Sequence, residues 1–328
     1  MSLLTVSGLT TTFPIEGRRI PIVDHVDFTL GRSEVFALVG ESGCGKSMTA
    51  LSLLRLVPKP GRIDEGSIVL DGRNLLELSV NEMRAVRGAD IAMIFQEPMT
   101  SLNPVVQAGA QVVEAIQLHE KVSGAAARDR TVALFKRVGI PDPEQRFEAY
   151  PHQLSGGLKQ RVMIAMALAT HPKVLIADEP TTALDVTIQA QILELLRDLR
   201  RDLGMAIVLI THDLGVVSEL ADRVAVMYAG NIVETGTTRD VVDAPLHPYT
   251  QGLVRSIPAR ARRGEKLYEI AGVVPPPAEW PPGCRFTNRC PVAMPQCHDV
   301  VPAMSSHARD HRAWCHAVSA SLAASVVP

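Results

Sequence analysis

The sequence lacks the features that would place the chain inside a membrane or on nucleic acid. A membrane-spanning helix needs about 20 consecutive apolar residues, and the most apolar stretch, Val162 to Ala169, is far shorter. The formal net charge of -2 gives no positive surface for nucleic acid or anionic lipid, so we expect no nucleic-acid partner. The N-terminal segment MSLLTVSGLTTTF has neither the basic start nor the apolar core of a signal peptide. We therefore expect a chain that is not exported and that reaches any membrane through partner proteins.

Cysteine is scarce except near the C-terminus. Four of the five cysteines, Cys284, Cys290, Cys297 and Cys315, lie within residues 284–328. In a reducing compartment such a cluster favours metal binding over disulfides. Residues 247–328 also contain 11 of the 23 prolines and both tryptophans. We predict a main domain over residues 1–246 and an irregular, Cys-rich C-terminal extension over residues 247–328.

Alternating strand and helix patterns predict an α/β fold for the main domain. Short apolar runs at Val35–Val39, Val174–Ala177 and Ala206–Ile210 are typical of buried strands. Between the last two runs, apolar residues recur at helical spacing from Ile188 to Leu199, and Gly204 follows as a helix stop. This order predicts a mixed, mostly parallel sheet with flanking helices and right-handed crossovers.

Two other parts of the main domain have different patterns. Residues 66–72 and 223–236 contain strands interrupted by Asp-Gly and Gly-Asn, which indicates antiparallel hairpins at the margin of the sheet. Residues 105–150 have no strand pattern and predict a helical insertion.

A phosphate-binding loop is predicted between the first strand and a helix that continues from Met48 to Leu56. The sequence GESGCGKS matches the pattern G-x-x-x-x-G-K-S/T. Its glycines let backbone amides curl round phosphates at a helix N-terminus. Lys46 should reach the β- and γ-phosphates, and the Ser47 hydroxyl should bind Mg²⁺. The predicted nucleotide-binding residues are Gly40, Glu41, Ser42, Gly43, Cys44, Gly45, Lys46, Ser47 and Met48.

Two carboxylates follow the second buried strand, where α/β sheets place their ligands. Asp178 should hold the shell of Mg²⁺, and Glu179 should orient and polarise the attacking water. Together with the phosphate loop, this pair predicts hydrolysis at the γ-phosphate of a bound nucleotide.

A third motif, LSGGLKQR at residues 154–161, links the sequence to a family. Ser155 is placed to cap a helix, and Gly156 and Gly157 expose the first amides, which makes a second anion-binding helix start. Here the chain resembles the ABC ATPases, whose signature is LSGGQ-like, although Leu158 and Lys159 precede Gln160. The resemblance implies that the signature of one subunit closes over the nucleotide held by another subunit.

The same resemblance implies the fold and further site residues. It implies an ABC ATPase core with an antiparallel β subdomain and a helical subdomain at about residues 97–155. Gln96 corresponds to the glutamine that touches Mg²⁺ and the attacking water, and His212 to the histidine that contacts the γ-phosphate. Asp185, in the segment Ala183–Asp185, belongs to the loop that crosses the dimer interface, and Phe13 corresponds to the aromatic residue that stacks on adenine.

The branch of the family is indicated outside the ATP motifs. The segment from Pro98 to Pro104, the segment from His247 to Thr250 and the Cys-bearing tail resemble the dipeptide/oligopeptide importer ATPases. This resemblance implies a peripheral subunit at the cytoplasmic face of the cell membrane, held by two transmembrane permease subunits. It also implies a second ABC ATPase subunit, usually a different chain, and a solute-binding protein that delivers dipeptides, oligopeptides or similar small solutes.

The four tail cysteines are spaced C-x5-C-x6-C-x17-C, which supplies enough thiolates for a tetrahedral zinc ion or a four-iron cluster. Zinc ribbons usually contain C-x2-C pairs, which this tail lacks, and some members of the resembled branch carry a 4Fe-4S cluster. We predict an iron–sulfur cluster, with zinc and free buried thiols as alternatives; His298 and His316 are further ligands in the zinc case. The expected role is to fold a tail with little core.

Two other functions compete with peptide import. One is a soluble ABC-fold ATPase with a mechanical role in repair or translation, which the near-neutral charge and the importer-like segments disfavour. The other is a nucleotide-binding regulatory partner without turnover, which the intact Glu179 and His212 disfavour.

Overall fold

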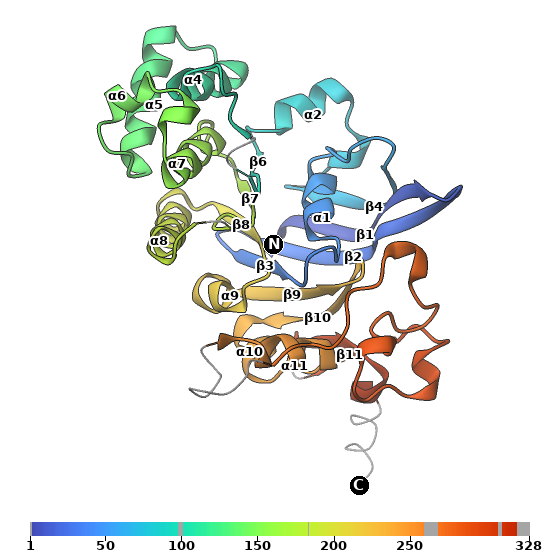
Figure 1. Cartoon of the computed structure of the whole chain (residues 1–328). Coiled ribbons are helices and arrows are strands. Elements are labelled where there is room, and N and C mark those ends of the chain that lie inside the picture. Colours follow the sequence, from blue (N-terminus) through green and yellow to red (C-terminus); the bar gives the residue numbers. More distant parts are fainter. Residues whose placement is uncertain (1, 98–100, 183, 259–267, 308–309, 320–328) are drawn as a thin grey trace. The chain divides into compact units, whose positions relative to one another are not determined.

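The computed structural model describes residues 2–97, 101–182, 184–258, 268–307 and 310–319 (Figure 1). These residues divide into two compact units. The first unit comprises residues 31–34 and 77–210, and the second comprises residues 2–30, 35–76 and those from 211 onward. Pro98–Thr100 of the importer-like segment and Ala183 of the interface loop lie outside the described residues.

Parallel strands form the centre of the first unit, in the order β6 (Ile91–Ile94), β7 (Val174–Asp178) and β8 (Ala206–Thr211). Their side chains are almost all buried, as near-continuous apolar runs predict. Between β7 and β8, α8 (Val186–Leu203) ends at Gly204, whose left-handed φ of 64° closes the helix. The predicted strand–helix–strand order is confirmed.

Outside these strands, the described part of the first unit is mainly helical, and helices occupy most of residues 105–150 as predicted (Figure 1). Gly109 permits close packing in this group, because a Cβ there would lie 2.2 Å from the ring of Phe147. The helices are α2 (Val80–Val86), α4 (Ala108–His119), α5 (Gly124–Arg137), α6 (Pro143–Phe147) and α7 (Gly156–Ala167).

The second unit contains strands in the order β11-β12-β10-β9-β3. β3 (Val35–Val39) pairs in parallel with β9 (Arg223–Tyr228), and β9 turns back into β10 (Asn231–Thr237) as a predicted antiparallel hairpin. This unit also contains α1 (Lys46–Leu53), α9 (Leu214–Leu220), α10 (Thr238–Asp243) and α11 (Pro248–Arg255).

An antiparallel sheet in the second unit has the order β2-β1-β4-β5. The sequence indicated β4 (Arg62–Leu70) and β5 (Arg73–Asn74), but not β1 (Ser2–Ile15) and β2 (Arg18–Gly31). The register of β1 against β4 shifts after Ser7, and Gly8 has a φ of 57°. Because a bulge of this kind interrupts period-two alternation, the strand pattern of β1 is hidden in the sequence.

The tail is less irregular than predicted. A short hairpin of β11 (Met304–Ser306) and β12 (Arg312–Trp314) extends the sheet beside β10. Glu234 of β10 is fully buried, and its carboxylate accepts hydrogen bonds from the amide of His247 at 2.8 Å and pairs with the His311 ring at 2.7 Å. The tail is thus anchored to the sheet by a buried polar cluster. None of the helices among the described residues is long and apolar enough to cross a membrane.

Candidate nucleotide site and cysteine cluster

The predicted phosphate loop follows β3, and α1 begins within it at Lys46, two residues earlier than expected. Gly40 must be glycine, because a Cβ would lie 2.2 Å from the carbonyl oxygen of Met227. Gly45 has a φ of 107°, a conformation that other residues rarely adopt. The loop therefore has the left-handed turn, leading directly into α1, of a helix start that can bind an anion.

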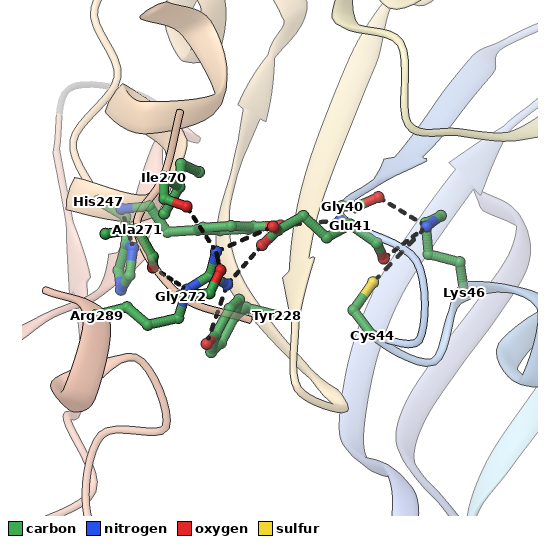
Figure 2. Close-up of polar contacts among 11 residues, drawn as sticks. Gly40, Glu41, Cys44, Lys46, Tyr228, His247, Ile270, Ala271, Gly272 and Arg289 are labelled. Atoms are coloured by element: carbon green, nitrogen blue, oxygen red, sulfur yellow. Dashed lines mark hydrogen bonds and ion pairs between the residues drawn. The ribbon is translucent and has the colours of Figure 1, made fainter. Parts of the chain in front are cut away.

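Lys46 lies inside this loop (Figure 2). Its ammonium donates hydrogen bonds to the carbonyl oxygens of Gly40 at 2.7 Å and Glu41 at 3.0 Å, and the residue is only 5% exposed. Cys44 is completely buried, and burial raises the pKa of its thiol. Lys46 is thus a buried cation that can exchange carbonyl partners for phosphate oxygens, whereas Cys44 is a neutral packing residue.

The carboxylates predicted for hydrolysis end β7 in the first unit. Asp178 is 3% exposed, and Glu179 follows it in a left-handed conformation with a φ of 46°. The carboxylate of Glu179 accepts hydrogen bonds from the Gln96 side-chain amide at 3.1 Å and from the Thr182 hydroxyl at 2.8 Å. Gln96 and Glu179, two predicted catalytic residues, are therefore in direct contact.

The signature and the interface loop also lie together in the first unit. Ser155 caps α7, and its hydroxyl accepts a hydrogen bond from the amide of Leu158 at 3.4 Å. Asp185 caps α8 in the same way, through the amide of Ile188 at 2.9 Å. A Cβ on Gly157 would lie 3.0 Å from Ile188. The exposed N-termini of α7 and α8 thus form one continuous surface.

Two further predicted residues belong to the second unit. His212 is exposed just after β8. Phe13 is half-buried on β1, and its ring covers Gly61, where a Cβ would lie 2.3 Å from it. The roles of these two residues at γ-phosphate and adenine remain predictions.

The four tail cysteines come together as free thiols. Burial raises the pKa of Cys284 to about 11, and Cys297, Cys315 and Cys290 act in the same direction. Burial and neighbouring thiols also raise the pKa values of Cys290 and Cys315. Cys290, Cys297 and Cys315 thus lie near enough to the Cys284 thiol to affect its pKa.

This grouping is looser than a single metal ion requires. Within the described ranges, no three Cys, His, Asp or Glu side chains are arranged so that they could hold one ion. Of the two histidines predicted as further zinc ligands, His298 is exposed, and the His316 ring lies 2.9 Å from the Val300 carbonyl oxygen.

Three residues near the site were not singled out by the sequence. Thr182 carried no signal of its own, and Tyr249 is indicated only as part of the segment from His247 to Thr250. Arg289 carried no signal, because its partner Glu41 lies 248 positions away in the sequence.

Comparisons with known proteins find matches in both parts of the chain. A family model described as ABC transporter matches residues 23–182, and one described as the C-terminal region of oligopeptide/dipeptide transporters matches residues 233–297. The chain is 49% identical to the dipeptide transport ATP-binding protein DppD of Haemophilus influenzae, with 96% of both chains covered. It is 51% identical to the oligopeptide transport ATP-binding protein AppD of Bacillus subtilis, again with 96% of both covered.

Solved structures with a similar fold include the ATP-binding cassette MJ0796, seen as a dimer in a post-hydrolysis state with ADP and phosphate. It is 28% identical, has a TM-score of 0.64 and covers 72% of this chain and 99% of its own. The cbiO1 protein of Clostridium perfringens, part of the ABC transporter complex cbiONQ, is also 28% identical, with a TM-score of 0.64, 74% of this chain and 91% of its own covered.

Proposed function

This chain belongs to the ATP-binding proteins of ABC transporters, in the peptide-transport branch, and from this premise we propose how it binds and uses ATP. It is an ATP-hydrolysing subunit that energises a membrane importer of dipeptides, oligopeptides or similar small solutes. The observation that carries this conclusion is identity of 49% and 51% to dipeptide and oligopeptide transport ATP-binding proteins over 96% of each chain. Permease subunits in the membrane and a second ATPase subunit are its partners.

We propose that the triphosphate binds in the loop of residues 40–47, with Lys46 on the β- and γ-phosphates. The loop geometry supports this, since Lys46 is already held inside the loop by two carbonyl oxygens. Phe13 would stack on the adenine.

Mg²⁺ fits the donor chemistry of the predicted ligands. Ser47, Asp178 and Gln96 offer hydroxyl, carboxylate and amide oxygens, and Mg²⁺ prefers oxygen ligands. When bound, the ion would neutralise charge on the β- and γ-phosphates. These three side chains would hold it.

Glu179 is the residue to which we assign activation of water. Its carboxylate would accept a proton from the attacking water as the water oxygen bonds to the γ-phosphorus. The bond from that phosphorus to the oxygen bridging the β- and γ-phosphates breaks, releasing ADP and phosphate. The contacts from Gln96 and Thr182 hold the carboxylate in one orientation before reaction. His212 would contact the γ-phosphate.

We infer that the second ATPase subunit completes the nucleotide-binding site. The exposed helix start at Ser155–Gly157 offers amides to an anion, and Asp185 lies beside it on the same surface. The signature of each subunit would close over the triphosphate of the other, and loss of the γ-phosphate would release the pair. We propose that the second ATPase is a different chain, that a binding protein delivers the solute, and that both ATPases lie at the cytoplasmic face.

The transport role is tested by purifying the tagged chain from its native host in mild detergent. We expect two permeases and a second ATPase to co-purify, and the reconstituted complex to accumulate labelled dipeptide or oligopeptide when ATP is supplied. Lys46→Ala should abolish accumulation. Co-purification with ribosomes or DNA in place of permeases would favour the soluble mechanical alternative instead.

For the tail, we propose that Cys284, Cys290, Cys297 and Cys315 hold a 4Fe-4S cluster, with zinc as the alternative. The mutual proximity of four free thiols supports four-thiolate ligation. Zinc would require the sulfurs to close round one ion at about 2.3 Å. A bound cluster would stabilise the thiolate forms and link segments of the tail between Cys284 and Cys315.

A further inference from the structure

Arg289 is one of the tail side chains that contact the phosphate loop (Figure 2). Its two terminal nitrogens donate to the two carboxylate oxygens of Glu41, at 2.7 Å and 3.0 Å. This is a bidentate pair of the kind that fixes both partners in orientation as well as in distance. Glu41 is the second residue of the phosphate loop.

The guanidinium is held in place from the other side by the tail. It donates to the carbonyl oxygens of Ala271 at 2.8 Å, Gly272 at 3.2 Å and Ile270 at 3.4 Å, and to the Tyr228 hydroxyl at 3.4 Å. The Arg289 side chain is only 4% exposed. Burial acts to lower its pKa, but the bonds with Glu41 and Tyr228 outweigh burial and the pKa is raised. Arg289 is therefore a fixed positive charge.

The backbone of Glu41 is constrained at the same time. Its amide donates to the hydroxyl of Tyr249 at 2.9 Å, and its carbonyl oxygen accepts from Lys46 at 3.0 Å. Tyr249 is itself fully buried on α11. The first half of the phosphate loop is thus held by two residues from beyond residue 246.

A carboxylate on a phosphate-binding loop is electrostatically unfavourable. ATP brings several negative charges to the loop, and an unpaired Glu41 would repel them through a partly buried, low-dielectric path. Arg289 neutralises this carboxylate and holds it to one side, so the field of Lys46 and of the loop amides is not opposed.

We propose that Arg289 is a positioning residue of the nucleotide site, which maintains ATP affinity by neutralising and fixing Glu41. The inference rests on the proposed function, because it takes residues 40–47 to hold the phosphates. It assigns the tail a direct part in nucleotide binding, in addition to marking the transporter branch.

The test measures binding of Mg-ATP by calorimetry and the KM and kcat of hydrolysis in the assembled complex. Arg289→Met removes the charge at similar length, and we expect affinity to fall on the order of tenfold, with KM raised and kcat little changed. The Mg-ATP affinity of Arg289→Lys should lie between those of the parent and Arg289→Met, since lysine restores the charge without the bidentate geometry. Arg312→Met, at an exposed tail arginine, is the matched control.

The decisive variant is the double substitution Glu41→Gln with Arg289→Met, which removes both charges. We expect it to bind Mg-ATP within about twofold of the parent, because the repulsion is gone. Thermal melting identifies any variant that fails to fold. Parent-like affinity in Arg289→Met, or a loss that Glu41→Gln does not restore, would overturn the inference. Lys46→Ala distinguishes failure of the proposed phosphate site from failure of the inference about Arg289. Parent-like binding of Mg-ATP in Lys46→Ala would reject the phosphate site itself. Loss of binding in Lys46→Ala would uphold the site and leave only the role of Arg289 to be decided by the other variants.

Discussion

The side-chain amide of Gln96 donates a hydrogen bond of 3.1 Å to the carboxylate of Glu179. These residues follow two neighbouring parallel strands, β6 and β7, which end at the same edge of the sheet. Glu179 holds this position in a left-handed conformation, a strain of order 1 kcal/mol that proteins typically retain at functional sites. The contact therefore links the residue assigned to water activation with a residue assigned to Mg²⁺.

Thr182 should fix the orientation of the Glu179 carboxylate without contacting the nucleotide. Thr182→Val removes the hydroxyl that donates to Glu179 at 2.8 Å but keeps the shape of the side chain. We expect kcat for ATP to fall about tenfold because Glu179 loses its fixed orientation, while KM stays near the parent value. Thr182→Ser should keep most activity, and Thr187→Val, at an exposed site, is the control. Equal kcat in Thr182→Val and the parent would show that this bond does not orient the base.

The two signature glycines should respond differently to alanine. A Cβ on Gly156 would lie 3.9 Å from Leu184, whereas one on Gly157 would lie 3.0 Å from Ile188. Gly156→Ala should therefore raise the free energy of unfolding by up to ~1 kcal/mol, as glycine replacements in helices do, and Gly157→Ala should not. Chemical denaturation measures both. Adding Ile188→Ala should relieve the crowding that Gly157→Ala creates. If the effects of the two changes on the free energy of unfolding were simply additive, the packing described would be contradicted.

His247 should make the folding stability of the chain depend on pH. Burial lowers the pKa of this residue from 6.5 to about 4, although Glu234 opposes the shift. The unfolded chain therefore takes up a proton as the pH falls below 6.5, while the folded chain does not until about pH 4. Folding stability contributed by neutral His247 should be complete above pH 6.5 and decline as the pH falls toward 4.

Urea unfolding at pH 7 and pH 5 measures this loss, for which we expect ~2 kcal/mol. His247→Asn is the comparison, because asparagine can still cap α11 but does not titrate in this range. The variant should lose less stability over the interval. Identical pH dependence in parent and variant would assign the titration to another group.

The cysteine cluster predicts a composition that can be assayed. Protein purified without oxygen should be brown and contain about four iron and four sulfide per chain. Cys290→Ser should lose most of this iron, whereas Cys44→Ser, outside the set, should retain it. A colourless protein that contains one zinc ion per chain would show that the cysteines hold zinc and not an iron–sulfur cluster.

Local motifs were predictable from the sequence, and long-range contacts were not. The phosphate loop, the Asp178–Glu179 pair and the cap at Ser155 each depend on residues within one strand, turn or helix. In contrast, β1 is interrupted by a bulge at Gly8, and β11 and β12 are only three residues long. None of these three strands shows a sustained alternation of apolar and polar residues.

The contact of Arg289 with Glu41 illustrates the other limit. Each residue is unremarkable in its own segment, and the pair forms only because the tail folds back beside the loop. Such a contact is set by tertiary packing, which periodicity and motif spacing do not encode.

The most direct test of the account is single-turnover and steady-state ATP hydrolysis by the assembled importer carrying Glu179→Gln, measured together with peptide uptake in the same vesicles. We predict that the variant retains bound ATP, that phosphate release falls at least a hundredfold, and that uptake is lost with it. The matched change Glu194→Gln, at an exposed carboxylate of α8, should leave both rates intact. Hydrolysis by Glu179→Gln at the parent rate would contradict the account.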